Sequence, residues 1–493
     1  MKKLLFFILL VLSFTAYCFA DGYVLSDDYY KSDAYSKYKS RSARKANPHS
    51  KLTGYTGAYY CEKCHEGAIK EVMNSSHYKW AGPVPVNYLK DNNGKFVTGG
   101  KEVGKKYKIG NCPGAYPLAN YLGMLPNKDG KMVGMGCSNC HIGGGFPPAD
   151  FEKATFEQKN AIECLYCHAE SYDKSKRNVI KVGEKDGNPI LRLTQDMSDK
   201  ALQSVGRPTN DACMRCHYTA GGGPLFKRGV DYASDVDVHA AKGIMCVDCH
   251  TKRPRTDHGM IRGAGLNNWA YDHYLDTESC VRCHTGQIHK DEIYNKCSAV
   301  ACVTCHVGKT GGLVHKDFSQ LHQSEKSGFW LFKVVVKDEH SVPVEYLWWD
   351  KTTGEKLTPT GGKNIEGSKI YPFKKYTSRI PVDKDGNRLP IKLGLVTKGG
   401  PGEDKNGNGV GDNLEKAIFI GEKLGTMVSG KPDKPFLKES SFVGFKDVTE
   451  YFSVSHGIQP KEKALKCSSC HGENPVIDWS KFGGKNPISI TDK

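Results

Sequence analysis

The sequence predicts a mainly α-helical protein with extensive irregular loops and a small β-containing insert. Three observations predict this fold class. Eight copies of the pattern Cys-x-x-Cys-His recur along the 493 residues, only 38% of the residues are hydrophobic, and the 160 residues between the seventh and eighth copies contain β-like stretches. A chain of this length with so few apolar side chains needs another apolar component in its core.

The N-terminus has the three parts of a secretory signal peptide over residues 1–20. Lys2 and Lys3 precede an apolar run over residues 4–16, and a small-x-small sequence ends at Ala20. The run is shorter than the roughly 20 residues that a membrane-spanning helix needs. We therefore expect a periplasmic protein that does not span the membrane and that begins with a flexible leader over residues 21–48.

The eight Cys-x-x-Cys-His motifs indicate covalently attached haem c. The two thiols bond to the haem vinyl groups, and the adjacent histidine reaches the iron as the proximal ligand. Zinc ribbons and redox dithiols also use Cys-x-x-Cys, but neither requires the following histidine. The sequence predicts eight haems, numbered in chain order. Their motif residues are Cys61, Cys64 and His65; Cys137, Cys140 and His141; Cys164, Cys167 and His168; Cys213, Cys216 and His217; Cys246, Cys249 and His250; Cys280, Cys283 and His284; Cys302, Cys305 and His306; and Cys467, Cys470 and His471.

Eight haems would also supply the missing apolar core, because side chains can wrap porphyrins rather than one another. Motifs one to seven predict a haem domain over residues 49–324, and motif eight predicts a C-terminal haem segment over residues 455–493. The haem-free insert between them, residues 325–454, contains turn residues typical of β hairpins. Its expected elements are strands over 329–336 and 342–349, a hairpin turn at 383–386 and a helix over 414–424.

One pattern in the insert matches a calcium-binding loop. Asp404, Asn406, Asn408 and Glu415 occupy the oxygen-ligand positions of D-x-[DN]-x-[DN]-G-x₅-E. The glycine-rich residues 397–402 before it are not expected to form an entering helix. The pattern therefore predicts a lone calcium loop with one Ca²⁺, and a solvated Asn/Gly/Asp loop is the alternative.

Ten histidines lie outside the motifs, which nearly equals the number of second axial ligands that eight electron-transfer haems require. We expect His49, His77, His239, His258, His289 and His456 to be distal ligands. His273, His315 and His322 are weaker candidates, and His340 lies in a strand-like stretch.

Several linkers resemble the octahaem cytochromes of the tetrathionate reductase family. The resemblance covers nearly all of the chain after residue 20, although the insert matches only loosely. It is carried by His49 to Lys51, by Asn111 and Cys112, by Lys200 with Gln203 to Thr209, and by the run from Ser455 through motif eight to Trp479. The family is related to hydroxylamine oxidoreductase and cytochrome c nitrite reductase.

The resemblance implies that haem 2 is the active haem. Lys200 would be its distal ligand and Cys112 a thiol beside it. The family has an aspartate three residues before the lysine, where this chain has Met197, so Asp196 or Asp199 would take that role. A disulfide between Cys112 and Cys297 is the alternative for the two spare cysteines.

These features imply a periplasmic reductase that splits tetrathionate into two thiosulfates with two electrons from a periplasmic or membrane-bound quinol-linked donor. A nitrite or hydroxylamine reductase and a non-catalytic electron conduit are the alternatives. All eight motifs end in histidine, so the Cys-x-x-Cys-Lys haem typical of cytochrome c nitrite reductases is absent.

The positive charge of the chain does not require a nucleic-acid partner. The formal charge is +16, and removal of Lys2 and Lys3 with the signal peptide would lower it to +14. Eight haems bring about 16 propionate charges, which leaves about +6 in the oxidised protein and about −2 in the reduced one. The remaining basic residues are expected to guide a small inorganic anion toward haem 2.

Overall fold

The structure is a computed structural model that describes residues 47–79, 82–83, 102–103, 116–118, 122–126, 129–130, 132–218, 229–250, 258, 280, 283–284, 288–290, 294, 297–325, 328–350, 358–425 and 439–487. The predicted signal peptide, most of the leader, Cys112 and His273 lie outside these residues. At Cys137 the backbone is described and the side chain is not.

Each described haem motif forms a short helical turn. This follows from its spacing, because positions i, i+3 and i+4 share one face of a helix. In motif one, for example, the N–H groups of Cys64 and His65 both donate to the carbonyl of Cys61. The motif helices are α3 (Ala58–Glu62), η1 (Cys137–Asn139), α7 (Cys164–His168), α9 (Asn210–His217), α11 (Cys246–Cys249), α14 (Cys302–His306) and α17 (Cys467–His471).

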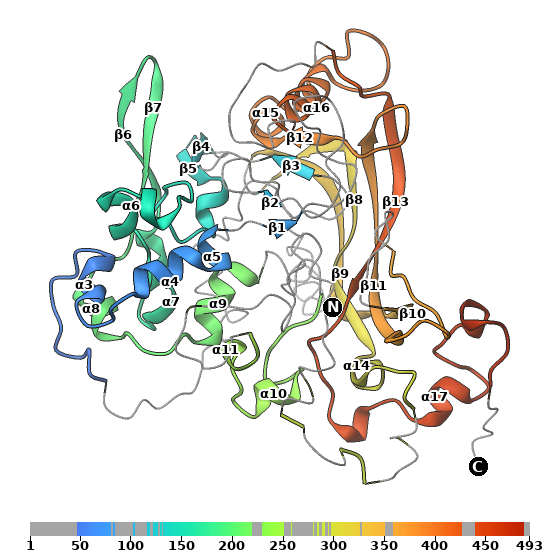
Figure 1. Ribbon diagram of the computed structural model, residues 1–493. Coiled ribbons are helices and arrows are strands. Elements are labelled where there is room, and N and C mark those ends of the chain that lie inside the picture. Colours follow the sequence, from blue (N-terminus) through green and yellow to red (C-terminus); the bar gives the residue numbers. More distant parts are fainter. Residues whose placement is uncertain are drawn as a thin grey trace, which may run out of the picture.

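The segments between the motifs add further short elements. The helices are α4 (Ala68–Asn74), α5 (Ser76–Lys79), η2 (Phe151–Lys153), α6 (Phe156–Asn160), η3 (Lys174–Lys176), α8 (Asp199–Gln203), α10 (Val238–Ala241), η5 (Lys461–Lys463) and η6 (Trp479–Phe482). Two-stranded sheets join β1 (Gly82–Pro83) to β2 (Glu102–Val103), β4 (Gly123–Pro126) to β5 (Met132–Met135), and β6 (Val179–Lys185) to β7 (Asn188–Leu193). The β6–β7 hairpin projects from the helical side of the molecule (Figure 1).

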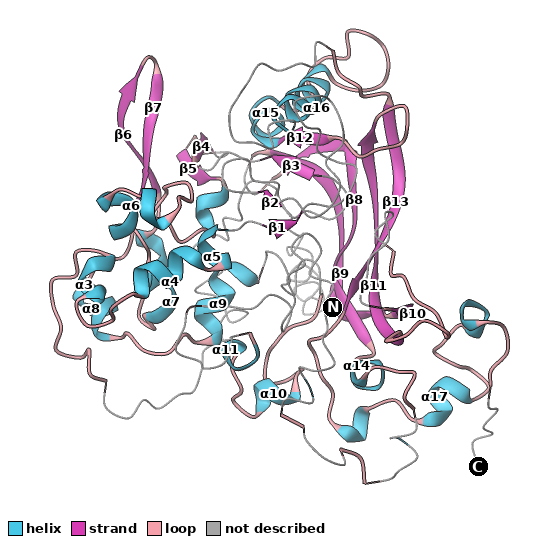
Figure 2. Ribbon diagram, viewed as in Figure 1, coloured by secondary structure: helices cyan, strands magenta, loops and turns pink. Residues whose placement is uncertain are grey.

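A long five-stranded sheet forms the other side of the molecule (Figure 2). Its strands are β8 (Lys309–Gln323), β9 (Trp330–Pro343), β10 (Glu345–Trp349), β11 (Lys369–Val382) and β13 (Gly444–Ser453). The order is β10-β11-β8-β9, and β13 also pairs with β11. Among the described pairings of this sheet, only that of β11 with β8 is parallel, over Thr377–Arg379 and His315–Asp317.

The sheet corrects the expectation of a mainly α protein with a small β insert. Strands of 14 or 15 residues at β8, β9 and β11 form a major layer, and β8 begins at Lys309, before the expected boundary at residue 325. Buried aromatic side chains explain its extent, because Trp349, Tyr371 and Phe373 are fully buried and stack edge to face.

Two helices cover one end of the sheet. These are α15 (Leu393–Gly399) and α16 (Asp412–Gly425), which follow β12 (Pro390–Lys392), and β12 pairs in parallel with β3 (Tyr116–Leu118). The position of α16 agrees with the expected helix over 414–424. However, α15 includes residues 397–399, which were not expected to be helical, and it ends at Gly399, several residues before Asp404 of the calcium-type loop. Leu393 and Val396 are buried against the sheet, so tertiary packing compensates for the low helix propensity of the glycines.

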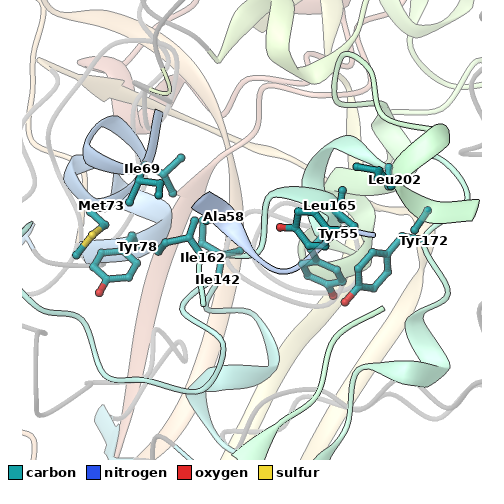
Figure 3. Close-up of a cluster of buried hydrophobic side chains, with 14 residues drawn as sticks. Tyr55, Ala58, Ile69, Met73, Tyr78, Ile142, Ile162, Leu165, Tyr172 and Leu202 are labelled. Carbon is teal, nitrogen blue, oxygen red and sulfur yellow. The ribbon is translucent and has the colours of Figure 1, made fainter. Parts of the chain in front are cut away.

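A cluster of buried apolar side chains holds the first haem motifs together (Figure 3). It combines Ala58 of α3, Ile142 next to His141, Leu165 of α7 and Leu202 of α8. A second cluster joins Trp349 and Phe373 of the sheet to residues around motif eight, including Leu465 and Cys470. The haem motifs are therefore anchored to both sides of the fold.

Candidate functional site: the haem motifs and their histidine pairs

Five motif histidines each face a histidine from elsewhere in the chain. The distances between ring centroids are 6.1 Å for His65 and His49, 6.0 Å for His168 and His258, 6.0 Å for His217 and His77, 6.2 Å for His250 and His456, and 6.0 Å for His284 and His239. Two metal–imidazole bonds of about 2.0 Å, with about 1.1 Å from each nitrogen to its ring centre, give a separation of about 6.2 Å. The spacing therefore fits one iron between the two rings of each pair.

The remaining described histidines outside the motifs have the following surroundings. His289, one of the six expected distal ligands, has its ring 5.8 Å from that of Tyr294. His315 lies in β8, where its Nδ1 is 2.8 Å from the hydroxyl of Thr377. His322 also lies in β8 and His340 in β9, and His340 has a φ of 62°. Five of the six expected distal histidines therefore lie opposite a motif histidine.

Neighbouring motifs contact one another through their cysteines. The side chains of Cys61 and Cys164, Cys140 and Cys216, Cys213 and Cys246, and Cys280 and Cys302 lie close together. Motifs one and three, two and four, four and five, and six and seven are therefore adjacent. Figure 1 shows the motif helices as a curved row from α3 through α7, α9 and α11 to α14 and α17. This arrangement suits electron transfer between neighbouring cofactors.

Hydrogen bonds at Nδ1 orient several of these rings. The Nδ1 of His168 is 2.8 Å from the carbonyl of Gly206, and that of His306 is 3.0 Å from the carbonyl of Gln459. A donor Nδ1–H leaves Nε2 as the metal-binding atom. Burial lowers the pKa of His168, which favours the neutral imidazole that binds metal. In the ring that faces His168, the Nδ1 of His258 is 2.9 Å from Oε2 of Glu71.

A buried ion pair supports the backbone of motif two. The side chains of Arg177 and Glu163 are 2% and 0% exposed, and Nε of Arg177 is 2.6 Å from Oε1 of Glu163. The guanidinium also donates to the carbonyls of Ser138, Asn139 and His141 at 2.7–3.1 Å. Arg177 therefore satisfies the last carbonyls of this helical turn, and the adjacent carboxylate raises the pKa of the guanidinium even though burial opposes it.

Motif three has a similar support. Arg215, inside motif four, donates to the carbonyls of Tyr166 and Ala169 at the end of α7, at 2.5 and 3.0 Å. Lys174 lies close by and donates to the carbonyl of Arg215 at 3.0 Å, and burial lowers the pKa of Lys174 to about 8. No sequence pattern identified Glu163, Arg177, Arg215 or Lys174, because only their contacts with distant backbone groups and, for Glu163 and Arg177, with each other distinguish them from surface charges.

The carboxylates expected near haem 2 have defined partners. Asp196 is buried and accepts hydrogen bonds from the N–H of Asp173 at 2.8 Å and from Nζ of Lys176 at 3.1 Å. Burial opposes ionisation of Asp196, but these hydrogen bonds lower the pKa of the carboxyl below its usual value. Asp199 accepts from the N–H of Gly54 at 2.8 Å.

Lys200 is exposed on α8, and its side chain makes no hydrogen bond or ion pair with the described part of the chain. The next residues of α8, Ala201 and Leu202, are buried in the cluster that contains Ile142. This packing places α8 in the same core as the residue that follows His141. Cys297 is exposed and lies near Cys467 and Cys470 of motif eight.

The calcium-type loop brings its predicted ligands together. Oε1 of Glu415 is 2.6 Å from Nδ2 of Asn408, and Oε2 is 3.1 Å from Nδ2 of Asn406. Asp404 accepts from the N–H of Gly409, whose φ of 81° allows the sharp turn. Two of the four are asparagines, and the described chain contains no group of three His, Cys, Asp or Glu residues that could hold a metal.

Two family models, one curated protein and one solved structure are similar to this chain. The family model "Cytochrome c bacterial" matches residues 314–474, and "Cytochrome c554 and c-prime" matches residues 163–251. An uncharacterized protein from Archaeoglobus fulgidus is 28% identical over 250 residues, which cover 42% of this chain and 79% of that protein. The crystal structure of octaheme cytochrome c from Shewanella oneidensis aligns with a TM-score of 0.57 and 22% identity, over 89% of this chain and 97% of that one.

The fold and the two family matches support a multihaem c-type cytochrome with covalently bound haem c, a class of protein whose haems transfer electrons. Over its described residues the chain has no helix that is both long enough and apolar enough to cross a bilayer.

Proposed function

We propose that this chain is a periplasmic octahaem c-type cytochrome that reduces a small sulfur oxyanion, tetrathionate, to thiosulfate. The observation that carries the haem network is the set of five imidazole pairs at 6.0–6.2 Å. In this proposal His49, His258, His77, His456 and His239 are the distal ligands of haems 1, 3, 4, 5 and 6. His141, His306 and His471 would be the proximal ligands of haems 2, 7 and 8.

The substrate proposal rests on the resemblance to the tetrathionate reductase family and on the residues around motif two. Haem supplies one-electron transfer, and two electrons break the central sulfur–sulfur bond of tetrathionate to give two thiosulfates. Lys200 would ligate haem 2 as the neutral amine and, once released and protonated, would stabilise the departing anion. Cys112 would contribute a thiol beside the substrate.

Asp196 is better suited to orientation than to proton donation in this scheme. A catalytic acid needs a raised pKa, whereas the hydrogen bonds from Asp173 and Lys176 lower the pKa of Asp196. We therefore assign Asp196 the role of anchoring the segment that leads to Lys200. Asp199 would hold the start of α8 against residue 54.

Stopped-flow reoxidation of the fully reduced protein tests the substrate. We expect tetrathionate to accelerate reoxidation in proportion to its concentration and to consume two electrons per molecule. K200M should slow this reaction at least tenfold, while K185M, at an exposed position of the β6–β7 hairpin, should match the wild type. No acceleration by tetrathionate would contradict the proposal.

Parallel measurements separate the alternatives. Nitrite and hydroxylamine, used in place of tetrathionate, test the related reductase. Electron paramagnetic resonance tests the conduit, because a lysine-ligated haem 2 should give a signal distinct from bis-histidine haems and this signal should disappear in K200M. If all eight haems give bis-histidine signals and none of the three compounds reoxidises the protein, the results would favour a conduit that only transfers electrons.

The calcium-type loop completes the proposed set of cofactors. We assign one Ca²⁺ to the loop of Asp404, Asn406, Asn408 and Glu415, because hard oxygen ligands in this order are what Ca²⁺ prefers. A flip of the two asparagine amides would turn their oxygens toward the ion.

A further inference from the structure

Asp237 lies where two distant segments of the chain meet. The residue is 2% exposed, and it immediately precedes α10. Oδ1 accepts from the N–H of His239 at 2.8 Å and is 3.3 Å from Nδ1 of the same residue. Oδ2 accepts from the N–H groups of Gly457 and Ile458, both at 2.9 Å. One carboxylate thus joins the segment of His239 to the segment of Gly457, which lies 220 residues after Asp237 in the sequence.

Each of these segments carries a histidine that faces a haem motif. The ring of His239 faces His284 of motif six, and the ring of His456, next to Gly457, faces His250 of motif five. Further bonds fasten the same segments, since the N–H of Val238 donates to the carbonyl of Ile458 at 2.9 Å.

The turn after His456 depends on this arrangement. Gly457 has a φ of 74°, and a Cβ at this position would lie 2.3 Å from Cγ1 of Val230. Only glycine allows the loop to approach so closely with its N–H directed at Asp237. The positive φ of Gly457 and its hydrogen bond to Asp237 therefore both fix the position of the residue next to His456.

We propose that Asp237 is a positioning residue that sets the distal ligands of haems 5 and 6 at the same time. The proposal rests on the bis-histidine ligation proposed above. Toward His239, a carboxylate that accepts from Nδ1–H fixes the ring orientation and makes Nε2 a stronger donor, which favours ferric iron at haem 6. Toward His456, it acts through the backbone and fixes the position of the ring without changing its basicity.

Glu71 provides an internal comparison. Its Oε2 is 2.9 Å from Nδ1 of His258, but its side chain is 43% exposed, whereas that of Asp237 is 1% exposed. A buried carboxylate is screened less by solvent, so its effect on the ligand is larger. Asp237 should therefore influence haem 6 more than Glu71 influences haem 3.

The ligation itself is tested first, on the full-length haem-loaded protein. H239A should convert the low-spin signal of haem 6 in the electron paramagnetic resonance spectrum to a high-spin signal. H456A should do the same for haem 5. The two variants therefore identify the signals of these two haems. If neither variant changes a low-spin signal, the proposed ligation fails, and the role of Asp237 fails with it.

The role of Asp237 is then tested with D237N, which keeps the size of the side chain. We expect the midpoint potential of haem 6 to rise by at least the equivalent of a tenfold change in the ferric-to-ferrous preference, or about 59 mV for one electron. E71Q should give a smaller rise at haem 3. D235N, at an exposed neighbouring position, should match the wild type.

D237A removes both acceptors and should alter the signals of haems 5 and 6 together. If D237A does not fold, D237N alone decides the question. A haem 6 potential in D237N equal to that in D235N, with the histidine variants behaving as expected, would overturn the role of Asp237 and leave the ligation intact.

Discussion

Arg177 shows how a single residue can support a haem motif without belonging to it. It donates to three carbonyls of motif two and pairs with Glu163, whose Oε2 also accepts from the N–H of Gly144 at 3.2 Å. Glu163 immediately precedes Cys164, so the same pair joins motifs two and three. The motif histidine His141 is held through its own carbonyl, which accepts from Arg177.

We predict that R177M destabilises the protein by about 3–5 kcal/mol, because it leaves the Glu163 carboxylate buried and uncompensated. Chemical denaturation followed by haem absorbance measures the change. The double variant E163Q/R177M should recover part of the loss, since no buried charge remains. R192M, at an exposed position of β7, is the control and should change stability by less than about 0.5 kcal/mol. A wild-type stability for R177M would contradict the assignment.

At the scale of elements, close backbone contacts determine how the haem segments meet the sheet. Gly229 has a φ of 65°, and a Cβ there would lie 1.9 Å from the carbonyl oxygen of Gly311 in β8. The segment 229–241 leads to Asp237 and His239. Its contact with β8 therefore connects the segment of His239, which faces His284 of motif six, to the five-stranded sheet.

We predict that G229A destabilises the protein more than G187A does. Both positions have positive φ, so alanine costs about 1–2 kcal/mol of backbone strain at each. A Cβ at Gly187 would meet no described atom within 4 Å, whereas a Cβ at Gly229 would clash with Gly311. Thermal unfolding measures the loss of stability in each variant. The difference between the two losses is the cost of the clash with Gly311. Equal losses would show that the contact with β8 is relaxed easily.

The calcium-type loop lies between α15 and α16, so its occupancy should affect that end of the sheet. At a Ca²⁺ concentration 100 times the dissociation constant, binding to the native state adds about 2.7 kcal/mol of stability. We predict that Ca²⁺ raises the Tm of the wild type and that E415Q abolishes the rise. E403Q, outside the ligand set, should respond like the wild type. A Tm independent of Ca²⁺ in the wild type would favour a solvated loop.

At the scale of the whole molecule, the motif contacts form a path rather than a set of separate sites. Motif four is central among the described motifs, because its cysteines contact Cys140 of motif two and Cys246 of motif five. Motif eight lies near motif seven, where Cys305 and Cys470 approach each other. Under the proposed function, this path would carry electrons to haem 2 through haem 4.

We predict eight thioether-bound haems per chain, measured by intact-protein mass spectrometry and by haem absorbance per protein. The double variant C467A/C470A should retain seven. C297A, which removes an exposed cysteine outside every motif, should retain eight. Any count other than eight in the wild type would contradict the haem number inferred from the motifs.

The spacing of the motifs determined much of the local structure of this protein. Cys-x-x-Cys-His predicts a helical turn with both thiols and the imidazole on one face, and the described motifs form such turns. Local pattern also predicted α16 and the position of β10. It underestimated the sheet, because β8 follows motif seven directly and contains two adjacent glycines, Gly311 and Gly312, that weaken its strand signal.

What only the tertiary structure decided is which histidine faces which motif. Composition and number identified His49, His77, His239, His258 and His456 as candidates, but His456 faces His250 and His77 faces His217, far apart in sequence. Such pairs depend on how whole segments pack, as do the buried roles of Arg177 and Asp237. A haem motif is a local pattern that one turn of helix satisfies, whereas a second axial ligand is a long-range contact that exists only once the chain has folded.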